Sequence, residues 1–204
     1  MTVSSQESPQ EPAQESALAQ FESDWAQAEA VVLDETIAES TELSDADRHA
    51  LTVMFANLPH GASPDGGRDL YDEARHALIK VIDLGSDTKE RFFVVRATAN
   101  LDCSPTGNCR VWIFRRRGHN YSYILEGATG QTVAILPSET NGLRDVVLSM
   151  HGSATMSVLK LYKLESIFYC RAACYEDRFE YLDSDGEIQG LDEPRITPCR
   201  KQRR

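Results

Sequence analysis

The sequence predicts an α+β protein, in which N-terminal helices precede an antiparallel β-meander sheet or small barrel with a short disulfide loop. Apolar residues recur at spacings of three and four in the first third of the chain. Further on, short apolar or alternating runs are separated by turn residues, and two of the five cysteines bracket a tight loop. We therefore divide the chain into a disordered acidic lead (1–16), a helical segment (17–76), an antiparallel β domain (77–175) and a loop-rich tail (176–204).

The lead consists mostly of Ser, Gln, Glu, Pro and Ala, so it has little to bury and is expected to be disordered. A first helix is then predicted to run to about Ala38, because five apolar residues fall on one helical face. These residues are Leu18, Phe21, Trp25, Ala28 and Val32. We expect this face to pack on the β domain, although it could instead contact a partner protein.

A second helix is predicted after Ser44. Ser44 and Asp47 have the spacing of a capping box, with Asp in the place of the usual Glu. The following apolar stripe is Leu51, Met54, Phe55 and Leu58. A shorter helix is expected to end near His76, before the first strand.

The β domain is predicted to begin with a hairpin. The apolar runs 78–84 and 91–98 flank a turn-rich segment, 85–89. After the cysteine loop, further strands are expected within 110–116, 121–126, 132–136, 143–150, 157–163 and 168–170, with a turn at 127–130. Because consecutive strands usually pair, this order predicts a meander.

The cysteines predict at least one disulfide. Pro105, Gly107 and Asn108 favour a chain reversal between Cys103 and Cys109, which brings the two Cβ atoms within bonding reach. Reduced thiols are the alternative there, and two cysteines without a nearby histidine do not complete a metal site. Among the other three, we favour a bond between Cys174 and Cys199, with Cys170 left inside a strand.

A disulfide favours a secreted or periplasmic location over a cytoplasmic one. No basic and then apolar leader follows Met1, so export would require that the chain is a mature form from which a leader has been removed. A cytoplasmic location is the alternative.

Charge and hydropathy limit the expected partners. Residues 1–47 carry twelve Asp or Glu and none of the 21 Lys and Arg, and the net charge is −11. This acidic arm repels phosphate backbones, so nucleic acid is not an expected partner, and the basic residues at 200–204 are interpreted as a solvated end. No apolar run approaches the roughly 20 residues of a membrane span.

Several segments together resemble a group of uncharacterised secreted bacterial β domains. The resemblance covers about residues 79–175. It rests on Cys103-Ser-Pro-Thr-Gly-Asn-Cys109, Trp112-Ile-Phe114, Thr140-Asn-Gly-Leu-Arg-Asp145, Ser149-Met-His-Gly-Ser-Ala154, Leu161-Tyr162 and Cys174-Tyr175. It implies export and a β fold, and because the group has no assigned activity, it implies no function.

The candidate ligand-binding residues lie on and beside the polar segment 151–155, because polar side chains held by rigid strands make recognition surfaces. They are Arg144, Asp145, His151, Ser153 and Thr155. We therefore expect an exported, non-enzymatic binding or interaction module for an unknown protein or cell-envelope ligand.

Two alternatives stay open. One is an envelope hydrolase that uses Asp145, His151 and Ser153, although no Gly-x-Ser-x-Gly elbow is present. The other is a structural envelope component tethered by its first residues. No metal or cofactor is expected. The five histidines show no pair at metal spacing, and the turn 83–90 lacks the regularly spaced Asp residues and Gly of a calcium loop.

Overall fold

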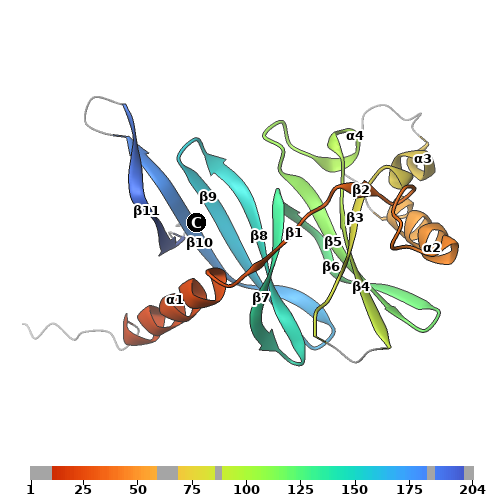
Figure 1. Ribbon diagram of the computed structural model, residues 1–204, viewed down its shortest axis with the longest axis horizontal. Coiled ribbons are helices and arrows are strands. Elements are labelled where there is room, and N and C mark those ends of the chain that lie inside the picture. The colour runs from red at the N-terminus through yellow and green to blue at the C-terminus, as the bar shows by residue number, and fades with distance from the viewer. Residues whose placement is uncertain (1–10, 59–68, 86–88, 183–186, 200–204) are drawn as a thin grey trace, which may run out of the picture.

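The computed structural model describes residues 11–58, 69–85, 89–182 and 187–199 (Figure 1). The basic residues at 200–204, which we interpret as a solvated end, lie outside these ranges. The helices are α1 Glu11–Trp25, α2 Asp45–Ala56, α3 Leu70–Arg75 and α4 Ala99–Asp102. The strands are β1 Glu29–Val31, β2 Glu35–Thr36, β3 Leu78–Ile82, β4 Glu90–Arg96, β5 Cys109–Arg117, β6 Asn120–Gly130, β7 Thr132–Thr140, β8 Leu143–Ser153, β9 Met156–Glu165, β10 Phe168–Leu182 and β11 Ile188–Pro198.

The strands form two antiparallel sheets. Sheet A has the order β1-β7-β8-β9-β10-β11, and sheet B has the order β2-β3-β4-β5-β6. Apart from β1, which pairs with β7, consecutive strands pair within each sheet, as expected of a meander. Antiparallel strands with a few helices confirm the broad fold class. However, the chain leaves sheet B after β6 and enters sheet A at β7, so the β part is not one sheet.

Three apolar cores hold these layers together. The core between the sheets takes side chains from both, among them Val94 and Ile113 of sheet B and Val146 and Leu148 of sheet A. A second core lies between sheet B and the helices α2 and α3, and a third lies between sheet A and α1. Figure 1 shows α1 beside sheet A, with α2 and α3 beyond sheet B. The molecule is therefore layered as helix, sheet, sheet and helices.

The first helix differs from the prediction at both ends. It begins at Glu11, so residues 11–16 are helical rather than disordered, and residues 1–10 lie outside the described ranges. Gln, Glu and Ala favour helix.

The same helix ends at Trp25, well before Ala38. Residues 29–31 instead form β1, which pairs with Val133–Ile135 of β7, and residues 35–36 form β2 in sheet B. Pairing with a sheet edge satisfies the main chain of this β-branched segment, which outweighs its helical spacing. Val32, predicted on the buried helical face, is 62% exposed.

The predicted loop-rich tail is wrong for residues 176–182 and 188–198. They complete β10 and form β11, which pair from Tyr175 with Pro198 to Leu182 with Ile188. Tyr175, Phe179 and Tyr181 fall at alternate positions among charged residues, a strand pattern that the acidic composition obscured.

The predicted turn at 127–130 is also absent, because β6 continues to Gly130. Gly127 has φ +53, and the register of β5 and β6 shifts nearby, between Val111 and Phe114. At Gly130 a Cβ atom would lie 3.1 Å from the Cβ of Leu148, so glycine allows the chain to cross closely to sheet A.

Other local predictions are confirmed. Disulfides join Cys103 to Cys109 and Cys174 to Cys199, and Cys170 is a free cysteine within β10. The hairpin of β3 and β4 and the capping box of Ser44 are also present. Within the described ranges, none of the helices combines the length and apolar character needed to cross a membrane.

Candidate functional site

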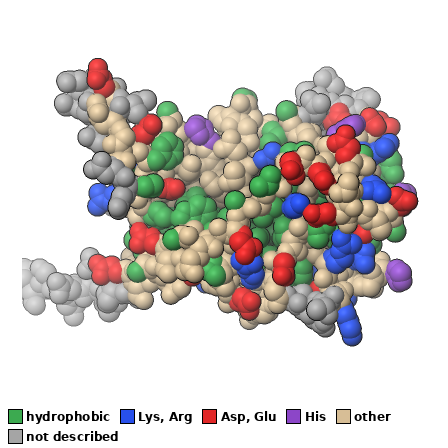
Figure 2. Space-filling model, viewed as in Figure 1, with side chains coloured by type: hydrophobic (Ala, Val, Ile, Leu, Met, Phe, Trp, Pro, Cys, Tyr) green, Lys and Arg blue, Asp and Glu red, His purple; other side chains and the backbone are tan. Residues whose placement is uncertain are grey.

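A small cavity lies between α1 and the outer face of sheet A. One wall is α1, which is anchored where the Phe21 ring stacks on Tyr175 of β10 at a centroid distance of 3.9 Å. Leu18 and Trp25 pack on the same core. In Figure 2 hydrophobic side chains gather beside α1, over the strands of sheet A. We call this space the α1 cavity.

The α1 cavity has a volume of about 270 Å³ and a largely apolar lining. Three lining residues are exposed, Ala17 and Gln20 of α1 and Ala172 of β10, and we call the side on which they lie the mouth of the cavity. The lining residues are Ala17, Gln20, Phe21, Asp24, Leu136, Ser138, Asp145, Leu161, Lys163, Ala172, Ala173 and Tyr175. A concave apolar space with a few polar groups has the character of a small-ligand site.

Asp145 is the principal polar group of the cavity. It comes from β8, and its side chain is 1% exposed. Its Oδ2 atom accepts a hydrogen bond from Ser138 Oγ at 3.1 Å and lies 3.3 Å from Lys163 Nζ. Its Oδ1 atom is buried and has no hydrogen-bond partner among the described residues. A buried acceptor left without a donor costs about 1–3 kcal/mol, so this atom favours a ligand that donates.

A second carboxylate, Asp24, lies on the α1 side of the cavity. Asp24 is 8% exposed and accepts a hydrogen bond from Gln20 Nε2 at 3.0 Å. The charged lining residues are thus two carboxylates and one ammonium group, that of Lys163. With this lining a cation is favoured over an anion.

The carboxylate of Asp145 also affects the next strand. Burial raises the pKa of the Tyr169 hydroxyl, and the negative charge of Asp145 raises it further. The Tyr169 hydroxyl therefore keeps its proton, which it donates to the carbonyl oxygen of Arg144. This contact ties β10 to β8 next to the cavity.

The structure separates the residues that the sequence grouped as a candidate site. Of these, only Asp145 lines the α1 cavity. Arg144 Nε donates to the carbonyl of Leu136 at 2.9 Å, and Arg144 Nη1 lies 3.1 Å from Glu29. Arg144 therefore joins β8 to β7 and β1, at the edge of sheet A.

His151 and Ser153 lie at the other end of β8, and Thr155 lies in the turn that follows. Asp145 and His151 are six positions apart on the strand, which corresponds to about 20 Å. Ser153 Oγ lies 3.4 Å from Thr155 Oγ1 and accepts a hydrogen bond from the Thr155 N–H at 3.4 Å. The three residue types of a hydrolase triad are therefore not brought together.

Sequence reasoning missed Asp24, Ser138 and Lys163. Asp24 falls between Phe21 and Trp25 on the apolar face of a helix, and an acid in that position is a recognisable sign of a buried polar site. Lys163 and Ser138 are on strands adjacent to Asp145. No local pattern pairs them, because their proximity depends on strand register.

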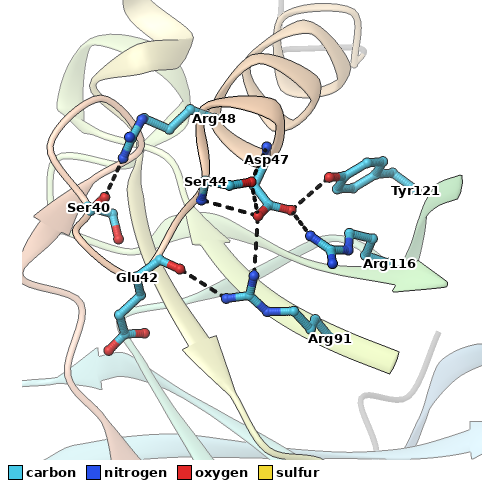
Figure 3. Close-up of polar contacts among 8 residues, drawn as sticks. All are labelled: Ser40, Glu42, Ser44, Asp47, Arg48, Arg91, Arg116 and Tyr121. Carbon is cyan, nitrogen blue, oxygen red and sulfur yellow. Dashed lines mark hydrogen bonds and ion pairs between the residues drawn. The ribbon is translucent and has the colours of Figure 1, made fainter. Parts of the chain in front are cut away.

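A second buried carboxylate, that of Asp47, differs from Asp145 because both of its oxygens have hydrogen-bond donors. Asp47 of α2 is wholly buried, and Figure 3 shows side chains of three strands, β4, β5 and β6, and of the N-cap residue Ser44 directed at it. Ser44 Oγ lies 2.6 Å from Oδ2, and Arg91 Nη1 lies 3.2 Å from the same atom. Arg116 Nη1 and the Tyr121 hydroxyl each donate to Oδ1 at 2.7 Å.

These contacts identify Asp47 as a structural anchor of α2 on sheet B. Burial by itself would raise the pKa of Asp47, but hydrogen bonds from Ser44, Tyr121 and Arg116 outweigh burial and hold the pKa well below its ordinary value. Both oxygens have donors, so no acceptor is left for a ligand. Asp145 differs because one of its oxygens lacks a donor.

Within the described ranges, no three His, Cys, Asp or Glu side chains gather closely enough to hold a metal ion. Comparisons with protein-family models, with curated proteins and with solved structures gave no match.

Proposed function

We propose that the protein is an exported, non-enzymatic binding module that holds a small ligand in the α1 cavity. The observation that carries this proposal is that Asp145, a residue that lines the apolar cavity, has a buried Oδ1 atom without a hydrogen-bond donor. A ligand that supplies the missing donor and fills the apolar space would gain both a hydrogen bond and buried area.

Export is supported by the two disulfides. The bond between Cys174 and Cys199 joins β10 to the end of β11, which is an edge strand of sheet A. Cys103 and Cys109 close the loop before β5. Such bonds persist in oxidising compartments and are rare where thiols are kept reduced.

A binding role is favoured over the hydrolase alternative by geometry. Asp145 is engaged by Ser138 and Lys163, and it is about 20 Å along the strand from His151. An acid that orients a catalytic histidine must contact that histidine.

The proposal is tested by blocking the cavity mouth in the full chain. Ala17 is exposed on α1 and lines the mouth, whereas Ala19 is exposed on the same helix and does not line it. The probes are cyclohexylammonium, cyclohexanol and cyclohexanecarboxylate, and binding is followed by NMR of the labelled protein.

We expect at least one probe to bind saturably to the unchanged protein and to the Ala19→Phe variant, with shifts near Tyr175 and Leu161. The Ala17→Phe variant should lose this binding. If no probe binds, or if binding survives in Ala17→Phe, the α1 cavity is not the binding site.

A further inference from the structure

We propose that the ligand of the α1 cavity is a small organic cation, namely an ammonium group on an apolar body, which Asp145 Oδ1 accepts as a hydrogen-bond donor. This inference rests on the proposed function, because it specifies the ligand class of the same cavity. It is carried by the arrangement of the charged and aromatic groups around the space.

The first step concerns hydrogen bonding. Asp145 has one oxygen with donors from Ser138 and Lys163 and one buried oxygen with none. A carboxylate accepts and does not donate, so a second carboxylate or an ether oxygen cannot satisfy Oδ1. The complementary ligand group is an N–H or O–H donor, and a charged N–H donor gives the stronger bond to a carboxylate.

The second step concerns charge. Asp145 and Asp24 are both buried, whereas the Lys163 side chain is 41% exposed. Water screens the ammonium group of Lys163 more than it screens the two carboxylates, so the interior of the cavity is negative. A cation entering this space meets attraction from both carboxylates, and an anion meets repulsion.

The third step concerns the apolar body. Leu136, Leu161 and Tyr175 lie on the sheet, and Phe21 of α1 stacks on the Tyr175 ring. Aromatic and aliphatic side chains bury hydrocarbon efficiently. A bare metal ion would leave these surfaces empty, whereas an alkyl or cycloalkyl ammonium would use both the rings and the carboxylates.

Lys163 is the internal competitor of such a ligand. Its ammonium group already contacts Asp145 Oδ2 at 3.3 Å, so the ligand and Lys163 share one carboxylate. Replacing Lys163 with a neutral residue should therefore strengthen cation binding, whereas replacing Asp145 should weaken it. Opposite effects from two neighbouring residues would not result from a general loss of structure.

The experiment measures the affinity of cyclohexylammonium by isothermal titration calorimetry, with cyclohexanol and cyclohexanecarboxylate as matched probes. Asp145→Asn should weaken binding about tenfold to a hundredfold, as for loss of a charged hydrogen bond, and Lys163→Gln should strengthen it several-fold. Glu22→Gln is the control, because Glu22 is exposed on α1 and does not line the cavity. Its affinity should match that of the unchanged protein.

The outcomes separate this inference from the proposed function. Binding of the carboxylate or the alcohol as tightly as the ammonium, with loss in Ala17→Phe, overturns the cation inference and leaves the cavity as a binding site. Weaker ammonium binding in Lys163→Gln also overturns it. Absence of binding by all three probes overturns both proposals.

Discussion

The side-chain amide of Asn108 forms two hydrogen bonds with the main chain of His151, which joins the two sheets at the end of β8. Asn108 Nδ2 donates to the carbonyl of His151 at 3.1 Å, and the His151 N–H donates to Asn108 Oδ1 at 2.8 Å. Asn108 is 7% exposed and lies in the loop that Cys103 and Cys109 close. The His151 side chain is exposed, so this position contributes to the fold through its backbone.

We expect Asn108→Asp to lower the free energy of unfolding by about 1–2 kcal/mol, because a carboxylate cannot donate to the His151 carbonyl. His151→Ala keeps both main-chain bonds and should change stability by less than about 0.5 kcal/mol. Urea denaturation of both variants measures the difference. An equal loss in the two variants would show that the His151 side chain carries the interaction.

The two disulfides should contribute unequally to stability. Cys174 and Cys199 are 25 residues apart in sequence, and Cys103 and Cys109 are 6 apart. Loop entropy then gives about 3.5 kcal/mol for the first bond and about 2.3 kcal/mol for the second. Thermal denaturation of the two double Cys→Ser variants should show the larger loss for the pair at 174 and 199. A larger loss for the pair at 103 and 109 would indicate that the unfolded chain keeps structure around the loop between Cys174 and Cys199.

Asp47→Asn should destabilise the protein by about 3 kcal/mol near neutral pH, at the low end of the range for a broken buried ion pair, since Arg91 and Arg116 can turn partly to water. The pKa of Asp47 is lowered by folding. Its contribution is therefore complete above the unfolded pKa and is lost as pH falls towards the folded pKa.

The stability difference between the unchanged protein and Asp47→Asn should thus be constant near neutral pH and shrink below about pH 4. Guanidinium denaturation at several pH values measures it. Asp45→Asn is the control, because Asp45 is exposed on the same helix and forms an ion pair with Arg48. A difference that grew on acidification would contradict a lowered pKa.

Phe21→Ala should release α1 from sheet A without unfolding the sheets. Phe21 is 3% exposed and supplies the ring that stacks on Tyr175, while the other cores do not involve α1. Hydrogen exchange should become faster in residues 11–25 and stay unchanged in β8 and β9. Glu22→Gln, on the exposed side of the helix, should leave both regions unchanged. Loss of protection throughout sheet A would show that α1 is required for the sheet to form.

Much of the local structure could be predicted from residue order. Ser44 and Asp47 marked the start of α2, and Leu51 and Phe55 marked its buried face. The spacing of Cys103 and Cys109 across turn residues identified a disulfide loop. These features depend on groups within a few residues of one another, so their free energies can be judged from sequence.

The candidate site was predicted only in part. Asp145 was identified as a candidate position, but it was grouped with His151, which lies far along the same strand. Lys163 and Asp24 were missed, because β9 and α1 reach Asp145 through strand register and through packing on Tyr175.

The sequence by itself determined the helix that begins after Ser44, the hairpin of β3 and β4 and the reversal between Cys103 and Cys109, because side-chain periodicity and turn chemistry act over short distances. Only the tertiary structure decided that residues 29–31 would join β7, that the strands would divide into two sheets, and that Asp145 would be buried with one oxygen lacking a donor. Each of these outcomes depends on competition among contacts between residues far apart in the chain. Such contacts acquire their energies only when the whole fold is assembled.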